Sequence, residues 1–268
     1  MFESQPLDIV RLVEKTKEQE PLKGESIVFD NGNTIVFDPF DDLKEEVTHK
    51  ASQIALEKFA VTLDARTFLS AWDEANDKLN FPFASHFLQE EPFIQAALKA
   101  IGVDDGKRPT LALAILGYYR ESFQEHLEND PRRGEIRDTL TELRKRGKHL
   151  AVLSNDRDFA ARSMFAWLGI EDLFEHFLTS EEIGVEKPDP EVFKIASQRF
   201  GKPIQDIIYV GDDPERDVVC AHNAGAKAIL YVPPGKFRSS TSWRDYSRIQ
   251  QEPDATIENF RDLLGVIK

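Results

Sequence analysis

Four short stretches of the sequence contain side chains that could together carry out phosphoryl transfer. They are Asp30, Ser154-Asn155, Lys187 and Asp212-Asp213. Carboxylates bind hard cations such as Mg²⁺, which prefer oxygen ligands. A lysine and a hydroxyl can hold phosphoryl oxygens, and one carboxylate remains to attack phosphorus. Phosphoryl transfer chiefly needs positioning and charge neutralisation, and these residue types supply both if the fold brings them together.

The fold must therefore place these side chains at one edge of a sheet. Short apolar runs predict buried strands that end at or just before these side chains, at 26–30, 149–153 and 207–210. Further strands are predicted at 176–179 and 227–232, with helices at 134–146, 158–168, 190–200 and 215–224. Alternating helices and apolar strands predict an α/β fold with a doubly wound parallel sheet. Ligands bind outside the carboxyl ends of such strands.

Residues 42–128 have a different character from the rest of the chain. Four helical stretches follow one another there without a strand pattern, at 42–60, 64–80, 86–101 and 109–128. We therefore predict a helical domain at 42–128, inserted into a core formed by 26–41 and 129–268. Residues 1–25 are predicted to form an N-terminal helical extension. The tail at 255–266 is predicted to add one short strand and one helix.

Composition restricts the partners and the compartment. The net charge of −14 disfavours nucleic acid and anionic lipid, and a phosphorylated substrate would need local positive charge at its site. The single cysteine, Cys220, excludes an internal disulfide and favours a reducing compartment. Residues 1–20 contain no continuous apolar stretch, so we expect neither a signal peptide nor a membrane span there. We expect a cytoplasmic protein, a monomer or a homodimer, without nucleic-acid or membrane partners.

Four motifs in this order resemble those of the haloacid dehalogenase superfamily of hydrolases. They are Ile-Val-Phe-Asp-Asn-Gly-Asn-Thr at 27–34, Val-Leu-Ser-Asn at 152–155, Lys-Pro-Asp-Pro at 187–190, and Gly-Asp-Asp at 211–213 with Asp217. The helical insert lies between the first two motifs, as in the subgroup with a helical cap. The resemblance covers roughly residues 26 to 232. It implies a Rossmann-like core with a cap domain.

The resemblance also implies a nucleophile and a metal site. Asp30 would be the nucleophile and would form an aspartyl-phosphate intermediate. The cofactor would be Mg²⁺, bound by the side chains of Asp30 and Asp212 and by the carbonyl oxygen of Gly32. Asp213 or Asp217 would support this group of ligands.

The remaining motif residues would bind the phosphoryl group of a small phosphorylated substrate. The resemblance assigns this role to the side chains of Ser154 and Lys187. Both residues would therefore take part in catalysis. Backbone N–H groups of Asn31 and Asn155 would help. Thr34 would shape the loop that follows the nucleophile.

Gly32 is the departure from the pattern that matters most. Phosphatases of this family have a second acid two residues after the nucleophile, which protonates the leaving oxygen and later deprotonates water. Such general acid–base help is typically worth about 10²–10⁴-fold in rate, and glycine cannot supply it. The leaving group could need no proton, as in an acyl phosphate. Alternatively, Asp38, Asp41, Asp42 or a cap residue could donate the proton.

The absence of an acid at Gly32 has two further explanations. The enzyme could cleave a different kind of bond, or the site could be degenerate. Dehalogenases of the family lack this acid but need no metal, which is at odds with the retained Asp212, Asp213 and Lys187-Pro188. A phosphonate-cleaving enzyme would need a cap lysine that forms a Schiff base, and the insert contains Lys44, Lys50, Lys58 and Lys78. We therefore predict a magnesium-dependent phosphatase acting on a small phosphorylated metabolite. The alternative is a catalytically weakened family member that binds a phosphometabolite or a protein partner.

Overall fold

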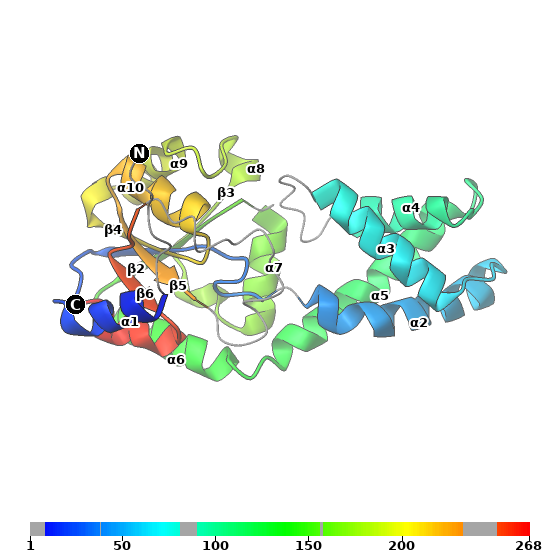
Figure 1. Ribbon diagram of the computed structural model, residues 1–268, viewed down its shortest axis with the longest axis horizontal. Coiled ribbons are helices and arrows are strands. Elements are labelled where there is room, and N and C mark those ends of the chain that lie inside the picture. The colour runs from blue at the N-terminus through cyan, green and yellow to red at the C-terminus, as the bar shows by residue number, and fades with distance from the viewer. Residues whose placement is uncertain (1–8, 38, 81–89, 156–157, 233–250) are drawn as a thin grey trace. The chain divides into compact units, whose positions relative to one another are not determined.

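The computed structural model describes residues 9–37, 39–80, 90–155, 158–232 and 251–268 (Figure 1). The chain divides into two compact units. The first unit consists of Met1–Phe37 and Pro131–Lys268, and the second of Asp38–Asp130. No helix in the described part of the chain is long and apolar enough to cross a membrane.

A six-stranded sheet forms the centre of the first unit. The strands are β1 (Ser26–Phe29), β2 (His149–Ser154), β3 (His176–Thr179), β4 (Ile207–Gly211), β5 (Lys227–Tyr231) and β6 (Ala255–Ile257). Their order is β3-β2-β1-β4-β5-β6, and every neighbouring pair is parallel. Parallel strands need helical crossovers, which cover both faces of the sheet. The predicted α/β fold with a doubly wound, Rossmann-like sheet is therefore confirmed.

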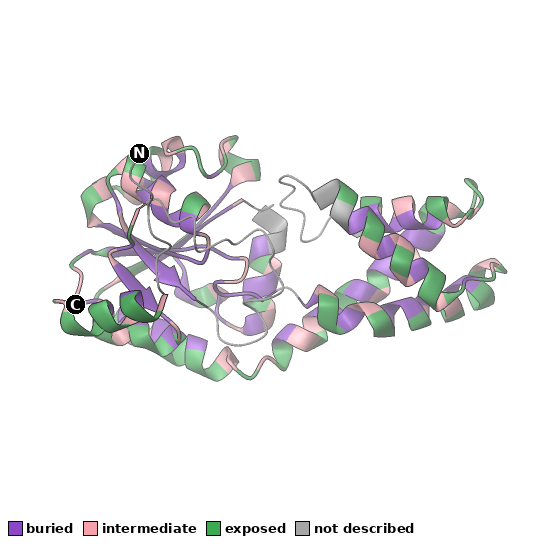
Figure 2. Cartoon of the chain, viewed as in Figure 1, coloured by how far each residue is buried: buried purple, intermediate pink, exposed green. Residues whose placement is uncertain are grey.

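The strands of the sheet are buried along most of their length (Figure 2). Both faces of the sheet are covered, which is why the strands read as continuous apolar runs. Val28 and Tyr209 are cross-strand neighbours on one face, which packs with α9 (Glu191–Phe200) and α10 (Cys220–Ala224). Phe29 points to the other face, where its ring lies 5.9 Å from that of Phe174 and 5.8 Å from that of Phe260.

The helices of the first unit follow the predicted pattern with two differences. They include α6 (Arg133–Lys145), α7 (Asp158–Leu168), α8 (Ser180–Ile183), α11 (Leu263–Val266) and the 3₁₀ turns η1 (Glu171–Leu173), η2 (Ile204–Asp206) and η6 (Phe260–Asp262). The helix predicted at 215–224 is instead a π-helical segment, η3 (Pro214–Val219), followed by α10. The four-residue helix α8 was not predicted, because it is too short to show a 3.6-residue period.

The N-terminal helix α1 (Ile9–Glu18) packs beside the outer strand β6. Leu12 is buried in the core of the first unit. The Thr16 hydroxyl donates to the Leu12 carbonyl at 2.9 Å and accepts from the Thr256 N–H of β6 at 2.8 Å. An uncovered edge strand invites pairing with other chains, so this helix protects the edge of the sheet.

The described residues of the second unit form helices joined by short non-helical connections. It contains α2 (Phe40–Phe59), α3 (Ala65–Asn80), α4 (Glu90–Ala100) and α5 (Arg108–Glu128). Its own core is aromatic, because Trp72 and Phe68 of α3 and Tyr119 and Phe123 of α5 are all buried. The rings of Trp72 and Tyr119 meet edge to face with centroids 5.7 Å apart.

Candidate active site

Strand order brings the first, second and fourth motifs to the same edge of the sheet. β1 lies between β2 and β4, and Phe29 is paired with Val152 and Val210. Asp30, the next residue, donates its backbone N–H to the Val210 carbonyl at 2.9 Å. Ser154 ends β2 and Asp212 follows β4. These side chains therefore occupy the carboxyl edge where the strand order reverses, which is the usual ligand site of such sheets.

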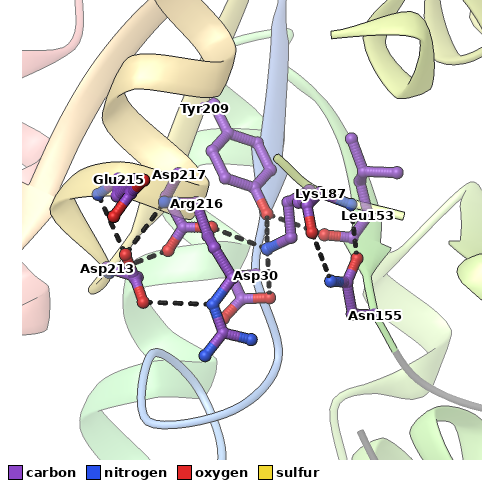
Figure 3. Close-up of polar contacts among 9 residues, drawn as sticks. All are labelled: Asp30, Leu153, Asn155, Lys187, Tyr209, Asp213, Glu215, Arg216 and Asp217. Carbon is purple, nitrogen blue, oxygen red and sulfur yellow. Dashed lines mark hydrogen bonds and ion pairs between the residues drawn. The ribbon is translucent and has the colours of Figure 1, made fainter. Parts of the chain in front are cut away.

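Lys187 lies at the centre of the polar contacts at this edge (Figure 3). Its Nζ is 2.8 Å from Asp30 Oδ1, 2.6 Å from Asp217 Oδ1 and 2.7 Å from the Tyr209 hydroxyl. The residue is only 5% exposed. Burial alone would lower the pKa of Lys187, but the adjacent carboxylates of Asp217 and Asp30 raise it above its ordinary value. The ammonium is therefore a fixed positive charge.

Three carboxylates form a cluster at this edge, and two of them, Asp30 and Asp217, contact the Lys187 ammonium. Asp30, Asp212 and Asp217 are all buried and offer oxygen atoms that lie within 4.8 Å of one another. Buried charges require compensation, and one lysine cannot balance three carboxylates. A divalent cation would restore the balance, and an all-oxygen donor set suits Mg²⁺. The residues present therefore fit a magnesium ion.

Asp217 reaches this cluster because Gly211 has no side chain. A Cβ atom at Gly211 would lie 2.3 Å from Asp217 Oδ2. Oδ2 instead accepts the backbone N–H of Asp213 at 2.9 Å. Burial raises the pKa of Asp217 to about 6, Lys187 opposes this rise, and Asp30 adds to it. The spacing of Gly211 and Asp217 in the sequence thus has a direct steric meaning.

The side chain of Asp213 has a different position from that of Asp217. Its Oδ1 accepts the backbone N–H groups of Glu215 and Arg216 at 2.9 Å, and its Oδ2 lies 3.2 Å from Arg216 Nε. Asp213 thus caps the first turn of η3, as an acidic N-cap residue does. It contacts the carboxylate cluster through its backbone N–H, whereas Asp217 contributes a carboxylate.

Asn155 holds the main chain of Lys187 with its side-chain amide. Its Nδ2 donates to the Lys187 carbonyl at 2.9 Å, and its Oδ1 accepts the Lys187 N–H at 2.8 Å. The pair joins the loop after α8 to the end of β2. Sequence reasoning assigned only a backbone role to Asn155, because the contact partner lies 32 residues away along the chain. The neighbouring Ser154 is buried, with 4% of its surface exposed.

The loop after Asp30 folds back on itself. The Asn31 carbonyl accepts the N–H groups of Ile35 and Val36 at 3.0 Å each, and Gly32 forms a bridge with Val36. Asn33 takes up the left-handed conformation with φ of +55°, which asparagine tolerates better than most residues. Asn31 and Thr34 are fully buried in this turn.

Tyr209 is a site residue that sequence reasoning missed. It is a buried residue of β4, and a tyrosine within an apolar strand pattern is expected to pack in the core. The available signal was its polar hydroxyl, which must find a partner when it is buried. That partner could not be named without the tertiary fold. Burial, followed by the charges of Asp217 and Asp30, raises the pKa of Tyr209 well above its ordinary value, so the phenol is neutral.

Comparison with known proteins identifies the class to which this fold and site belong. The family model described as haloacid dehalogenase-like hydrolase matches residues 91–231, which is more than half of the chain. The chain belongs to this family and is a hydrolase of its type. The predicted family is therefore confirmed.

Curated relatives and solved structures agree with this assignment. The glyceraldehyde 3-phosphate phosphatase of Methanopyrus kandleri is 30% identical over 64% of this chain and 69% of its own length. The ribulose-1,5-bisphosphate 5-phosphatase of Halopiger xanaduensis is 28% identical over 60% of this chain and 65% of its own length, slightly less than two thirds.

Two solved structures share the fold. A 2-haloacid dehalogenase from Pseudomonas syringae pv. Tomato DC3000 has a TM-score of 0.58 and 24% identity, and the match covers 90% of this chain and 97% of that one. A hydrolase of the same superfamily from Bacillus subtilis, bound to magnesium, has a TM-score of 0.60 and 16% identity over 92% of this chain and 99% of that one. At these identities the likeness shows the fold alone.

Proposed function

We propose that this chain is a magnesium-dependent phosphatase that acts on a small phosphorylated metabolite through an aspartyl-phosphate intermediate at Asp30. The observation that carries the proposal is the cluster of three buried carboxylates, two of which, Asp30 and Asp217, pair with the buried Lys187. The phosphatases among the relatives and the magnesium bound to the Bacillus subtilis structure support it. We further propose that the second unit is a cap domain that selects the substrate.

The nucleophilic step is assigned to Asp30. One of its carboxylate oxygens would bond to phosphorus while the bond to the leaving oxygen breaks, and water would later attack the acyl phosphate and release Asp30. Lys187 orients the Asp30 carboxylate, because its ammonium donates a hydrogen bond to Oδ1 at 2.8 Å. The Ser154 hydroxyl and the backbone N–H groups of Asn31 and Asn155 are proposed to hold phosphoryl oxygens, and the buried Lys187 ammonium supplies positive charge beside them.

The carboxylates of Asp30 and Asp212 and the carbonyl oxygen of Gly32 are proposed as magnesium ligands. Asp217 and Asp213 would support them, the first through its carboxylate and the second through its N–H to Asp217. When bound, Mg²⁺ supplies positive charge that neutralises the phosphoryl oxygens.

The leaving oxygen needs a proton that Gly32 cannot donate. Among the candidate donors, Asp41 is paired with Lys44 at 2.8 Å, and Asp38 lies outside the described residues. A substrate with a weakly basic leaving group, such as an acyl phosphate, would avoid the requirement. We therefore expect acyl phosphates to be hydrolysed faster than alkyl phosphates.

The test follows inorganic phosphate release from phosphate esters, acyl phosphates and phosphonates in the presence of Mg²⁺. Asp30→Asn should abolish release, because an amide cannot act as the nucleophile, and should preserve the circular dichroism spectrum of the wild type, because the amide has nearly the same size and shape as the carboxylate. Gly32→Asp should increase hydrolysis of alkyl phosphates by restoring an acid at the position that lacks one. Full turnover by Asp30→Asn would contradict the mechanism.

Metal binding has an independent test. Mg²⁺ should raise the thermal unfolding midpoint of the wild type, because a ligand that binds only the folded state stabilises it. The rise should be absent in Asp212→Asn, which removes one charged ligand. An equal rise in both proteins would place the ion elsewhere.

Two other functions make different predictions in the same assays. Halide displacement by Asp30 is suggested by the dehalogenases among the similar proteins, but carboxylate clustering would repel an anionic haloacid. Halide release from 2-haloacids without Mg²⁺ would favour this function. A catalytically weakened binding protein would bind phosphometabolites tightly and turn over none of them, with or without Gly32→Asp.

A further inference from the structure

Tyr209 joins two parts of the site that are far apart in the sequence. Its hydroxyl accepts from Lys187 Nζ and donates to the Leu153 carbonyl, both at 2.7 Å. The side chain is completely buried, and its ring meets that of Phe193 of α9 edge to face, with centroids 5.1 Å apart. The phenol oxygen thus connects β4 with the C-terminal end of β2 and with the loop that carries Lys187.

The hydrogen-bonding capacity of the ammonium shows why this contact matters. A lysine ammonium has three N–H donors, and Lys187 Nζ has three acceptors, namely Asp30, Asp217 and Tyr209. Two of these acceptors are charged and attract the ammonium, whereas the phenol is neutral. Tyr209 is therefore the acceptor that fixes the third direction without competing for the charge.

The second hydrogen bond of Tyr209 makes this arrangement directional. Because its only hydroxyl proton is donated to the Leu153 carbonyl at 2.7 Å, the oxygen must present a lone pair to Lys187. A phenylalanine would fill the same space in the core but would hold neither partner. Core packing alone thus explains the ring of Tyr209 and leaves its hydroxyl unexplained.

We propose that Tyr209 is a positioning residue that fixes the Lys187 ammonium between Asp30 and Asp217 in the geometry that phosphoryl transfer requires. The kinetic consequence rests on the proposed phosphatase function, whereas the positioning itself does not. Tyr209 acts only through Lys187 and need not touch the substrate.

Tyr209→Phe should reduce kcat while leaving substrate binding largely intact. Misplacement of a reacting group by an ångström can cost about 100-fold in rate, so we expect kcat to fall at least about tenfold and KM to stay within about threefold. Tyr231→Phe is the matched control, because Tyr231 is another buried strand tyrosine, on β5, whose ring stacks on Phe37. It should retain wild-type kcat.

A double variant separates positioning from general core damage. If Tyr209 acts through Lys187, adding Tyr209→Phe to Lys187→Met should slow turnover no more than about twofold further, because residues that act as a unit are not additive. A multiplicative loss in the double variant would show that Tyr209 acts by another route and would overturn the proposal.

Nuclear magnetic resonance tests the positioning without any substrate. In protein labelled with [¹⁵N]lysine, the ammonium signal of Lys187 is identified by its absence in Lys187→Met. Tyr209→Phe should shift or broaden this signal, and Tyr231→Phe should not. An unchanged signal together with unchanged kcat would overturn the proposal. If the wild type hydrolyses no substrate, the phosphatase function fails while this spectrum still decides the role of Tyr209.

The same contact can be observed from its other side if Tyr209→Phe does not fold. In protein labelled with [¹³Cζ]tyrosine, Lys187→Met should shift the Tyr209 resonance and leave that of Tyr231 in place. An unmoved Tyr209 resonance would show that the hydroxyl does not depend on Lys187, and would refute the proposal.

Discussion

Gly211 is the last residue of β4, and replacing it by alanine should displace the Asp217 carboxylate from the cluster. The new Cβ atom would lie 2.3 Å from Oδ2, 2.4 Å from Cγ and 2.6 Å from Cβ of Asp217. Ordinary van der Waals contact begins at 3.4 Å, so the carboxylate must retreat by about 1 Å. Asp217 is 1% exposed and is held by Lys187 and by the Asp213 N–H, so it has no room to retreat without breaking these contacts.

The magnitude follows from what is broken. Overpacking a tight interior costs about 1–3 kcal/mol, and separating a buried ion pair costs about 3–5 kcal/mol when one partner is removed. Because Asp217 is displaced and remains in the protein, we expect Gly211→Ala to lower the free energy of unfolding by about 3 kcal/mol. Magnesium-dependent turnover should fall as well, since Asp217 belongs to the proposed ligand group.

Urea unfolding followed by far-ultraviolet circular dichroism measures the stability, and phosphate release measures the turnover. Gly134→Ala is the matched control in the same unit, because no atom lies within 4 Å of the new Cβ at that helical position. It should change stability by no more than about 1 kcal/mol. If Gly211→Ala matched Gly134→Ala in both stability and turnover, the steric reasoning about Gly211 and Asp217 would be refuted.

Three further predictions concern contacts around the site and the sheet edge. Asn155→Ala should reduce kcat and lower stability by about 1–2 kcal/mol in urea unfolding, because both hydrogen bonds to the Lys187 main chain are lost; unchanged values would contradict this. His222 Nε2 lies 2.9 Å from Asp254 Oδ2. The hydrogen bond to Asp254 raises the pKa of His222 above its ordinary value of 6.5. Burial alone would raise the pKa of Asp254, but the contacts with His222 and with the Ala228 N–H lower it below its ordinary value of 3.8. The pair therefore stabilises the fold most between these two values, so His222→Gln should cost more stability at pH 5.5 than at pH 8.5, and equal losses would exclude the ion pair. Thr16→Val should lower stability by about 1–3 kcal/mol by leaving a buried N–H of β6 without its acceptor, whereas Thr16→Ser should not.

Much of the core could be predicted because its signals are local. Continuous apolar runs such as Ile27–Phe29 and Ile207–Val210 predict buried parallel strands, since both faces of these strands are covered. The placement of Asp30, Ser154 and Asp212 just after such runs predicted their meeting at one edge. The helical character of the second unit was equally visible, because its apolar faces recur at helical spacing.

Short and distorted elements were less accessible. The segment predicted as one helix at 215–224 begins as the π-helical η3, and its sequence pattern does not differ from that of an α-helix. The tail strand was predicted, but not its place as β6 beside α1. That place depends on the contact of Thr16 with Thr256, which are 240 residues apart in the chain.

The sequence by itself determined the parallel α/β fold, the family and the set of candidate side chains, because each can be recognised from short local patterns and from their order along the chain. The tertiary structure alone decided how those side chains divide their work. The absence of a side chain at Gly211 leaves room for Asp217 in the cluster. The Asp213 carboxylate instead accepts backbone N–H groups at the start of η3. The order of β2, β1 and β4 places the Tyr209 hydroxyl beside Lys187. These contacts are long-range and steric, and no local pattern encodes them.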